Sequence, residues 1–182
     1  MIPQAKTLTL RDGREAVLKS PEVSDAASML DFLKKTAGES NNLLRRPHEV
    51  TLSLMEEADF LRQLLDDPRR FMLNAVVGED LAGNVSVYPV GTRERVRHRA
   101  GVGIAVRQQY WGQGLGKRLM QAATEQAREL GYEQLELTVY ADNARGLALY
   151  KALGFETWGH TKNACKMDDG SYRDDVYMGL FL

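Results

Sequence analysis

The sequence predicts a single domain over residues 1–182 of the α/β (α+β) class, and three observations predict it. A short apolar strand, Val102–Val106, leads through a glycine-rich turn into an amphipathic helix that ends near Leu130. A strand with a period of two follows at Gln134–Tyr140. Asp-Gly pairs at residues 12–13 and 169–170 indicate β-hairpins near both ends of the chain. The length suffices for one such domain with a substantial core.

Composition bounds the classes of function. The 24 basic and 25 acidic residues nearly cancel, whereas general nucleic-acid binding favours a basic excess. The single cysteine, Cys165, excludes an internal disulfide and a cysteine-rich zinc site, and we expect no bound metal. Met1–Leu10 lacks the apolar segment of a signal peptide, and no run approaches the ~18 apolar residues of a membrane span. The expectation is a cytoplasmic protein that binds neither nucleic acid nor membrane.

The start of the chain predicts a hairpin followed by a helix. Strands at Lys6–Leu10 and Ala16–Lys19 flank the first Asp-Gly turn. Ser24 is placed to cap a helix over Asp25–Thr36, and Gly38 is expected to end it. The expected apolar face of this helix consists of Ala26, Met29, Leu30 and Leu33.

A polar loop and a second helix come next. The loop, Glu39–Glu49, is either a solvated connector or a wall over a binding site. The helix covers about Ser53–Leu65 before an Asp-Asp-Pro stop. Its inward positions are expected to be Leu54, Ala58, Leu61 and Leu65.

Two strands and a basic run precede the central strand. The strands are Arg70–Val77 and Asn84–Val90, joined by a turn over Gly78–Gly83. The run Arg93–Arg99 is expected to be a solvated loop tip.

The glycine-rich turn Trp111–Gly116 is suited to binding phosphate. Glycine lets a ligand approach the backbone closely, and the N–H groups at a helix start have no helical partner. The helix dipole favours an anion there, and Lys117 and Arg118 add positive charge. Taken alone, such a turn is also compatible with a plain strand–helix connection.

Two general phosphate motifs do not fit this turn. The dinucleotide fingerprint would need glycine at Lys117 or at Leu119, and a P-loop would need glycine at Trp111. The window from Trp111 to Gly116 instead resembles the pyrophosphate loop of the GCN5-related N-acetyltransferases, Arg/Gln-x-x-Gly-x-Gly/Ala. Gly114 and Gly116 match this pattern, and Trp111 departs from it at the first position.

A second stretch, Asp142–Phe155, carries the other motif. Asn143 is placed to cap a helix, and Gly154 to end it in a Schellman-type stop. Asn143 and Tyr150 are seven residues apart and therefore share one helix face. The pattern resembles the last helix of the same acetyltransferases, Asn-x-x-Ala/Gly-x-x-Leu-Tyr-x-x-x-Gly-Phe. The matching residues are Asn143, Gly146, Leu149, Tyr150, Gly154 and Phe155.

The tail predicts two further strands, around Glu156–Lys166 and Tyr172–Leu182. Cys165 lies in the first of them and has no evident histidine partner, which argues against a nucleophilic role. The tail is also acidic, which either attracts a cationic amine or belongs to a solvated hairpin tip. The acidic residues are Asp168, Asp169, Asp174 and Asp175.

Both motifs occur in the family's order, separated by one helix and one strand, so most of the chain resembles the GCN5-related N-acetyltransferase (GNAT) superfamily. The resemblance implies a mixed, mostly antiparallel sheet of six or seven strands flanked by about four helices. The strands Val102–Val106 and Gln134–Tyr140 would be parallel and splay apart around acetyl-CoA. The implied activity is acetyl-CoA-dependent transfer to a primary amine of a small molecule or a protein. A homodimer through the tail strands is implied as well.

The resemblance also assigns the cofactor-binding residues. The pyrophosphate would meet the N–H groups of Gly112–Lys117, and the pantetheine would run along the central strand as an added strand would. Asn143 would hydrogen-bond the pantetheine arm. The expected set is Ile104, Ala105, Val106, Trp111, Gly112, Gln113, Gly114, Leu115, Gly116, Lys117, Asn143 and Tyr150.

Direct acetyl transfer needs a neutral amine, donors for an oxyanion and a proton for the leaving thiolate. The resemblance gives the oxyanion to the backbone N–H of Val106 and the proton to the catalytic hydroxyl of Tyr150. The base stays open between water and four side chains, Glu39, Glu94, His98 and Asp142.

Two other classes of function stay open at this point. A catalytically silent acyl-CoA-binding sensor would bind the thioester without turnover, and Tyr150 argues against it while Trp111 does not. A protein that binds a mononucleotide at the glycine turn is disfavoured by the motif spacings. The sequence does not define the amine acceptor, because a fold does not choose its substrate.

Overall fold

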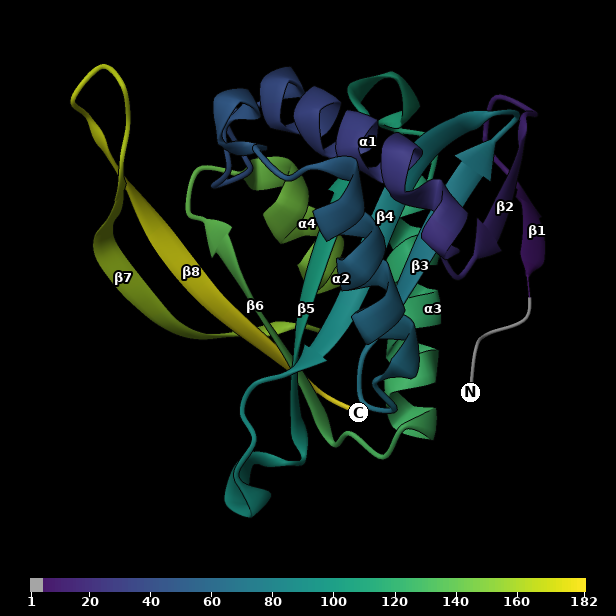
Figure 1. Ribbon diagram of the computed structural model, residues 1–182. Helices are drawn as coiled ribbons and strands as arrows, with labels where there is room; N and C mark the ends of the chain where they lie inside the picture. Colours follow the sequence, from purple (N-terminus) through teal and green to yellow (C-terminus); the bar gives the residue numbers. More distant parts are fainter. Residues whose placement is uncertain (1–4) are drawn as a thin grey trace.

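The computed structural model describes residues 5–182, so the first four residues of the Met1–Leu10 segment lie outside it. The described residues form an eight-stranded sheet in the order β1-β2-β3-β4-β5-β6-β8-β7, one strand more than expected (Figure 1). Neighbouring strands are antiparallel except β5 and β6. The strands are β1 (Lys6–Thr9), β2 (Glu15–Lys19), β3 (Phe71–Val77), β4 (Asp80–Pro89), β5 (Arg99–Val106), β6 (Gln134–Tyr140), β7 (Glu156–Lys166) and β8 (Tyr172–Phe181).

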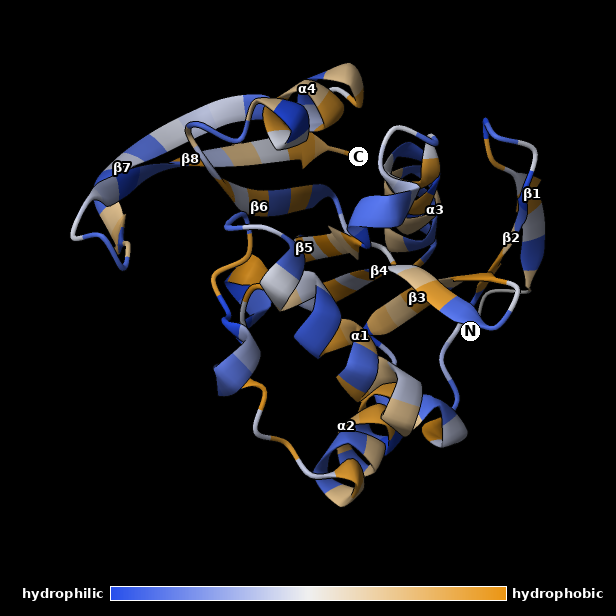
Figure 2. Cartoon of the chain, turned by 90° about the horizontal axis from the view of Figure 1, so that it is seen from above, coloured by the Kyte–Doolittle hydropathy of each residue, from blue (hydrophilic) through white to orange (hydrophobic). Residues whose placement is uncertain are grey.

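Helices cover both faces of the sheet. Figure 2 shows α1 (Ala26–Glu39) and α2 (Leu54–Asp66) on one face, and α3 (Leu115–Glu129) and α4 (Ala144–Ala152) on the other. Each face buries its own apolar cluster: Phe32 and Leu61 belong to the first, and Leu119 belongs to the larger second one. The result is the expected mixed fold, in three layers.

The parallel pair β5/β6 opens into a cleft, as expected. Its pairing covers only Arg99–Gly101 against Gln134–Glu136, and from Val102 onward the two strands separate. The opening lies beside the glycine-rich turn, which leads into the start of α3. The cleft therefore forms where a parallel pair diverges, at the carboxyl ends of both strands.

The first helix differs from the sequence prediction at both ends. It starts at Ala26 after a 3₁₀ turn, Val23–Asp25, in which the Asp25 carboxylate accepts from the Glu22 N–H at 2.9 Å. Ser24 is therefore not its cap, and Gly38 lies inside the helix. The buried face is Ala26, Met29, Phe32 and Thr36, while Leu30 and Leu33 are only half-buried.

The second helix is rotated relative to the prediction. Ser53 caps it by accepting from the Glu56 N–H at 3.2 Å. Glu57, Leu61 and Leu64 are buried, and Leu54 is exposed. The apolar pattern misplaced this face because a buried glutamate is part of it.

The predicted turn Gly78–Gly83 and the predicted basic tip are also wrong in part. Strand β4 already begins at Asp80, so Gly83 lies within it. A Cβ at Gly83 would come within 2.9 Å of Leu119 Cδ1, which explains the glycine at this position of the strand. Arg99 begins β5 and pairs with the buried carboxylate of Glu136. Burial raises the pKa of Glu136, but the hydrogen bonds from Arg99 and Tyr177 outweigh it and hold the pKa below its ordinary value.

Candidate active site

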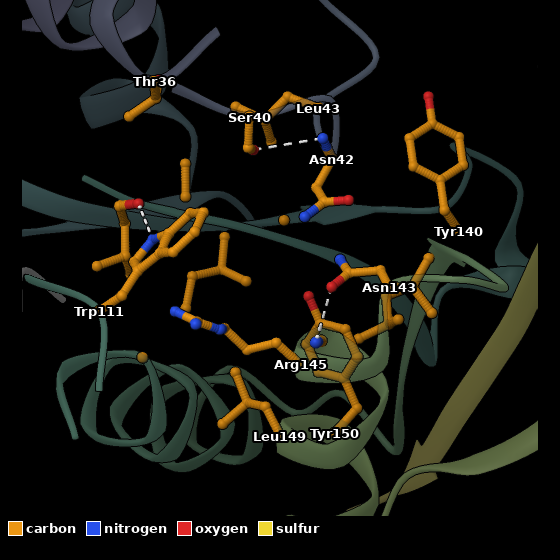
Figure 3. A pocket seen from close by; sticks show the side chains of 18 of the residues that line it. Thr36, Ser40, Asn42, Leu43, Trp111, Tyr140, Asn143, Arg145, Leu149 and Tyr150 are labelled. Atoms are coloured by element: carbon orange, nitrogen blue, oxygen red, sulfur yellow. Dashed lines mark hydrogen bonds between the residues drawn. The ribbon is translucent and has the colours of Figure 1, made fainter. Parts of the chain in front are cut away.

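A cavity of about 870 Å³ occupies the cleft between β5 and β6. One side of it, the glycine-loop side, is lined by residues from within the ranges 104–106, 111–117 and 143–150. The other, the hairpin side, is lined by residues from within the range 36–44 together with Tyr140, Cys165 and Asp175. Figure 3 shows the two sides facing each other, with Trp111 and Tyr150 on one side and Asn42 on the other.

The end of β5 presents unpaired backbone groups to this cavity. Val106 pairs with Gly83, and the Arg107 N–H donates to the Ala82 carbonyl at 2.9 Å. Because backbone groups in an antiparallel pair point alternately to either side, those of Ile104 and Val106 point away from β4. They point toward β6, which no longer pairs there.

Trp111 already satisfies one of these groups. Its indole N–H donates to the Val106 carbonyl at 2.7 Å. The Val106 N–H and both backbone groups of Ile104 stay directed at the cavity. A ligand with amide groups can pair with them as a missing strand would.

The glycine loop is shaped by two residues with positive φ and by the first hairpin. Gly112 and Gly114 have φ of +78° and +84°, which L-residues with a side chain rarely adopt. Arg11 donates from its side chain to the Gly112 carbonyl at 3.2 Å and from its backbone to the Gln113 carbonyl at 3.3 Å. Since N–H and C=O point in opposite directions across a trans peptide, the N–H groups of residues 113 and 114 point away from Arg11.

The start of α3 completes an anion-binding geometry. The first helical hydrogen bond runs from the Arg118 N–H to the Gly114 carbonyl, so the N–H groups of residues 115–117 precede it. The cationic side chains of Arg11, Lys117 and Arg145 line the cavity around this point. Of the residues predicted from the sequence for this side, all line the cavity except Gln113.

Helix α4 places Asn143 and Tyr150 at the cavity. Asn143 Oδ1 accepts from the Gly146 N–H at 3.0 Å, which confirms the predicted cap. A Cβ at Gly146 would lie 2.8 Å from Asn143 Nδ2, which explains the glycine there. The hydrogen bonds from Gly154 N to Lys151 O and from Phe155 N to Tyr150 O form the predicted Schellman stop.

The hydroxyl of Tyr150 points into the cavity (Figure 3). Its ring packs against Phe155 with centroids 5.9 Å apart. Its hydroxyl makes no hydrogen bond with any residue of the range 5–182. Burial raises the pKa of Tyr150 to about 12, so this hydroxyl stays protonated at neutral pH and can donate.

The hairpin side is held together by Arg173 of β8. Its guanidinium donates to Asp142, to Asn42 Oδ1 at 3.2 Å and to the Asn41 carbonyl, and it stacks on the Tyr140 ring at 4.0 Å. Only 13% of its side chain is exposed. Arg173 thereby ties the loop after α1 to β6 and β8, so this loop is a wall of the cavity and not a free connector.

None of the four side chains proposed as a base from the sequence is both free and in the cavity. Glu39 lines it, but its carboxylate accepts from Arg107 Nε and from the Gln108 N–H, each at 2.6 Å. Asp142 is bound to Arg173, and this hydrogen bond lowers its pKa. Glu94 and His98 lie before the start of β5, at the end opposite the cavity.

Asp175 is the acidic side chain that the sequence left among the tail charges. It sits directly opposite Tyr140 in the β6/β8 ladder and lines the cavity. Within residues 5–182 its carboxylate accepts no hydrogen bond and forms no ion pair, and burial raises its pKa. Cys165 also lines the cavity, where its sulfur accepts from the Tyr140 hydroxyl at 3.3 Å rather than pairing with a histidine.

Comparisons with known proteins agree with this geometry. The model of the acetyltransferase (GNAT) family matches residues 39–155. L-amino acid N-acetyltransferase AaaT of Escherichia coli is 33% identical over 131 residues, which is 70% of this chain and 80% of that protein. The [ribosomal protein bS18]-alanine N-acetyltransferase of Escherichia coli is 36% identical over 77 residues, 42% of this chain and 51% of that protein.

Solved structures share the fold over most of this chain. An acetyltransferase of the GNAT family from Streptococcus pneumoniae superimposes with a TM-score of 0.88 at 27% identity, covering 92% of this chain and 99% of its own. The putative acetyltransferase yncA of Salmonella typhimurium, solved with its cofactor acetyl-CoA, gives 0.78 at 18% identity, covering 92% and 94%. Within the described part of the chain, no helix is long and apolar enough to cross a membrane.

Proposed function

The chain belongs to the GNAT acetyltransferase family and is an acetyl-CoA-dependent N-acetyltransferase, and from this premise we propose that it acetylates an α-amine by direct attack. One observation carries the proposal. The unpaired end of β5, the free hydroxyl of Tyr150 and the free carboxylate of Asp175 all face one cavity. These are the donor, acid and base that direct transfer requires.

The glycine-loop side fits acetyl-CoA, which supplies the acetyl group as a thioester. The N–H groups of residues 113–117 suit its phosphates, because they are close to the positive end of α3. The free backbone groups of Ile104 and Val106 suit the pantetheine amides. The amide nitrogen of Asn143 is available to the same arm, since its oxygen is used as the helix cap.

Each reacting group has one role. The N–H of Val106 stabilises the negative charge that develops on the acyl oxygen. Asp175 takes the proton that the amine must lose, and its raised pKa makes it a better base than an ordinary aspartate. Tyr150 gives a proton to the leaving thiolate. Cys165 takes no part, so no acyl-enzyme forms.

The α-amine is the acceptor class that the relatives support. One relative is named as an L-amino acid N-acetyltransferase and another as an alanine N-acetyltransferase of ribosomal protein bS18. The nitrogen that amino acids and alanine have in common is the α-nitrogen. The hairpin side adds a carboxylate for the cationic form of such an amine, with Leu43 and Leu44 as apolar walls. Both a free amino acid and a protein N-terminus stay within the proposal.

We also propose a single domain, a cytoplasmic location and a homodimer. Residues 1–182 act as one domain, since all eight strands belong to one sheet. The single thiol, Cys165, fits a cytoplasmic location. The long outer strand β7 offers a sheet edge for a homodimer, and a monomer in sedimentation velocity would contradict that pairing.

A matched pair of amines tests the acceptor class. Nε-acetyl-lysine presents only an α-amine and Nα-acetyl-lysine only an ε-amine, so thiol release from acetyl-CoA is measured with each and with alanine-initiated peptides. We expect release with α-amines alone, and a loss of about 100-fold in kcat for Asp175→Asn. Release with the ε-amine alone would contradict the proposal. Acetyl-CoA binding without release from any amine would support a silent sensor instead.

A further inference from the structure

Arg145 and Trp111 form a pair across the mouth of the cavity. Arg145 comes from the first turn of α4, and its side chain reaches toward Trp111, the first residue of the glycine loop (Figure 3). The guanidinium carbon lies 4.4 Å from the centroid of the indole ring. Both residues line the cavity together with Gly112 and Gly114.

The guanidinium of Arg145 has no other partner in the described residues. Four arginines there stack on an aromatic ring: Arg14, Arg69, Arg145 and Arg173. Three of them also donate hydrogen bonds, to Asp12, to the Arg97 carbonyl and to Asp142. Arg145 alone donates none and belongs to none of the ion pairs of residues 5–182. Its five N–H donors are therefore left for an anion.

Trp111 is fixed in the position where the loop pattern has arginine or glutamine. Its indole N–H is bound to the Val106 carbonyl at 2.7 Å, so the side chain has no donor left for a phosphate. The same bond holds the ring in one orientation, with a face toward Arg145. The loop thus carries no free side-chain donor at its first position, and a guanidinium from another helix lies against the residue there.

We propose that Arg145 binds the phosphates of coenzyme A and supplies the side-chain contact that Trp111 lacks, with Trp111 as the positioning residue. Arg145 approaches from α4, whereas the N–H groups of residues 113–117 belong to the loop and α3. A phosphate between them meets donors from both sides of the cleft. Guanidinium–phosphate hydrogen bonds are charge-assisted and often bidentate, which makes them roughly twice as strong as neutral ones.

Arg145 also affects which acyl thioester the enzyme accepts as donor. Acyl-pantetheine without phosphates makes the backbone contacts along β5 but none with Arg145. The Arg145–Trp111 pair therefore selects thioesters of coenzyme A over phosphate-free pantetheine thioesters. This inference rests on acetyl-CoA as the donor, and it is independent of the roles proposed for Tyr150 and Asp175.

Calorimetric titration tests the pair directly. Coenzyme A and pantetheine are titrated into the wild type and into Arg145→Ala. The control is Arg128→Ala, which removes an equal charge from an exposed residue near the other end of α3 that does not line the cavity. We expect Arg145→Ala to weaken coenzyme A binding by about 30-fold at low salt and by a smaller factor at high salt, and Arg128→Ala to weaken it by about 2-fold or less. Pantetheine affinity should be the same in all three proteins.

Two further arms complete the test. The titration of wild type and Arg145→Ala is repeated with 3′-dephospho-coenzyme A. If Arg145→Ala weakens this ligand as much as it weakens coenzyme A, Arg145 contacts the pyrophosphate. If the two proteins bind this ligand equally well, Arg145 contacts the 3′-phosphate. Trp111→Leu should lose part of the coenzyme A affinity because the aromatic ring that Arg145 stacks on is gone. Trp111→Phe retains an aromatic ring at this position and should retain the coenzyme A affinity. Melting temperatures verify folding of each variant. Wild-type affinity in Arg145→Ala, or an equal loss for pantetheine, would overturn the proposal.

Discussion

The two sides of the cavity are built in different ways. The glycine-loop side comes from residues 104–117 and 143–150, and it offers mostly backbone groups, held by positive φ angles and helix ends. The hairpin side joins side chains that are far apart in the sequence, such as Arg173 and Asn42, which are 131 residues apart. In the proposed function, acetyl-CoA is bound mostly by backbone groups, which substitutions hardly alter. The amine acceptor, which differs between the named relatives, is bound by side chains, which substitutions alter freely.

The largest expected effect is on the glycine-loop side. Gly114→Glu should abolish coenzyme A binding, a loss of about 100-fold or more, because it adds left-handed strain, bulk and a negative charge at the proposed phosphate site. Gly131→Glu is the matched control. Gly131 has a φ of +79° at the other end of α3, with no atom within 4 Å of an added Cβ. Normal coenzyme A affinity in Gly114→Glu would refute the phosphate site.

The next largest effect is expected at Tyr150, on the same side, where a substitution should change turnover but not the binding of acetyl-CoA. Tyr150→Phe removes only the hydroxyl that faces the cavity, and we expect kcat to fall by about 100-fold with an unchanged dissociation constant for acetyl-CoA. Steady-state kinetics and calorimetry measure the two quantities. Full turnover in this variant would remove Tyr150 from the mechanism.

A smaller effect is expected when the hairpin side alone is loosened. Arg173→Ala frees the loop at Asn41–Asn42 and should raise KM for the amine by about 10-fold, with acetyl-CoA affinity unchanged. Arg46→Ala is the control, since Arg46 joins the same loop to Asp168 through an exposed ion pair worth about 0–1 kcal/mol. Equal losses for amine and acetyl-CoA would mean that the two sides are not separable.

The smallest effect is on stability, and it comes from a residue that lines neither side of the cavity. Glu57 of α2 is 2% exposed, its Oε1 has no hydrogen-bond partner among residues 5–182, and burial raises its pKa. The folded state then binds the proton more tightly than the unfolded state, so this residue costs stability at neutral pH and less as pH falls through the raised pKa. Glu57→Gln should stabilise the protein by about 1 kcal/mol at pH 7 and raise Tm by a few degrees. A gain that grows at lower pH would contradict this account.

Features that depend on neighbouring residues could be predicted from the sequence, and contacts between distant residues could not. Strand Gln134–Tyr140, the Asn143 cap and the Gly154 stop depend on neighbouring residues, and their predictions are confirmed. The contacts of Arg11 with Gly112 and of Arg145 with Trp111 depend on tertiary packing. No local pattern signals them, although Trp111 at the loop's first position was a hint that a partner lies elsewhere.

The hairpin side shows the same limit. The sequence named Asp175 as one of four acidic tail residues but could not separate it from the other three, because only the register of β6 against β8 puts it opposite Tyr140. Glu39 looked free because Arg107, which holds it, lies 68 residues further along the chain. The face of α2 was misplaced because burial of Glu57 contradicts hydropathy.

Two-substrate kinetics test the central claim most directly, which is direct transfer between the two sides of one cavity. Initial rates of thiol release are measured while acetyl-CoA and an α-amine are both varied. Direct attack predicts intersecting double-reciprocal lines, because both substrates must be bound together, and it predicts the same pattern in Cys165→Ala. Parallel lines in the wild type, with activity lost in Cys165→Ala, would show an acetylated Cys165 and contradict the account.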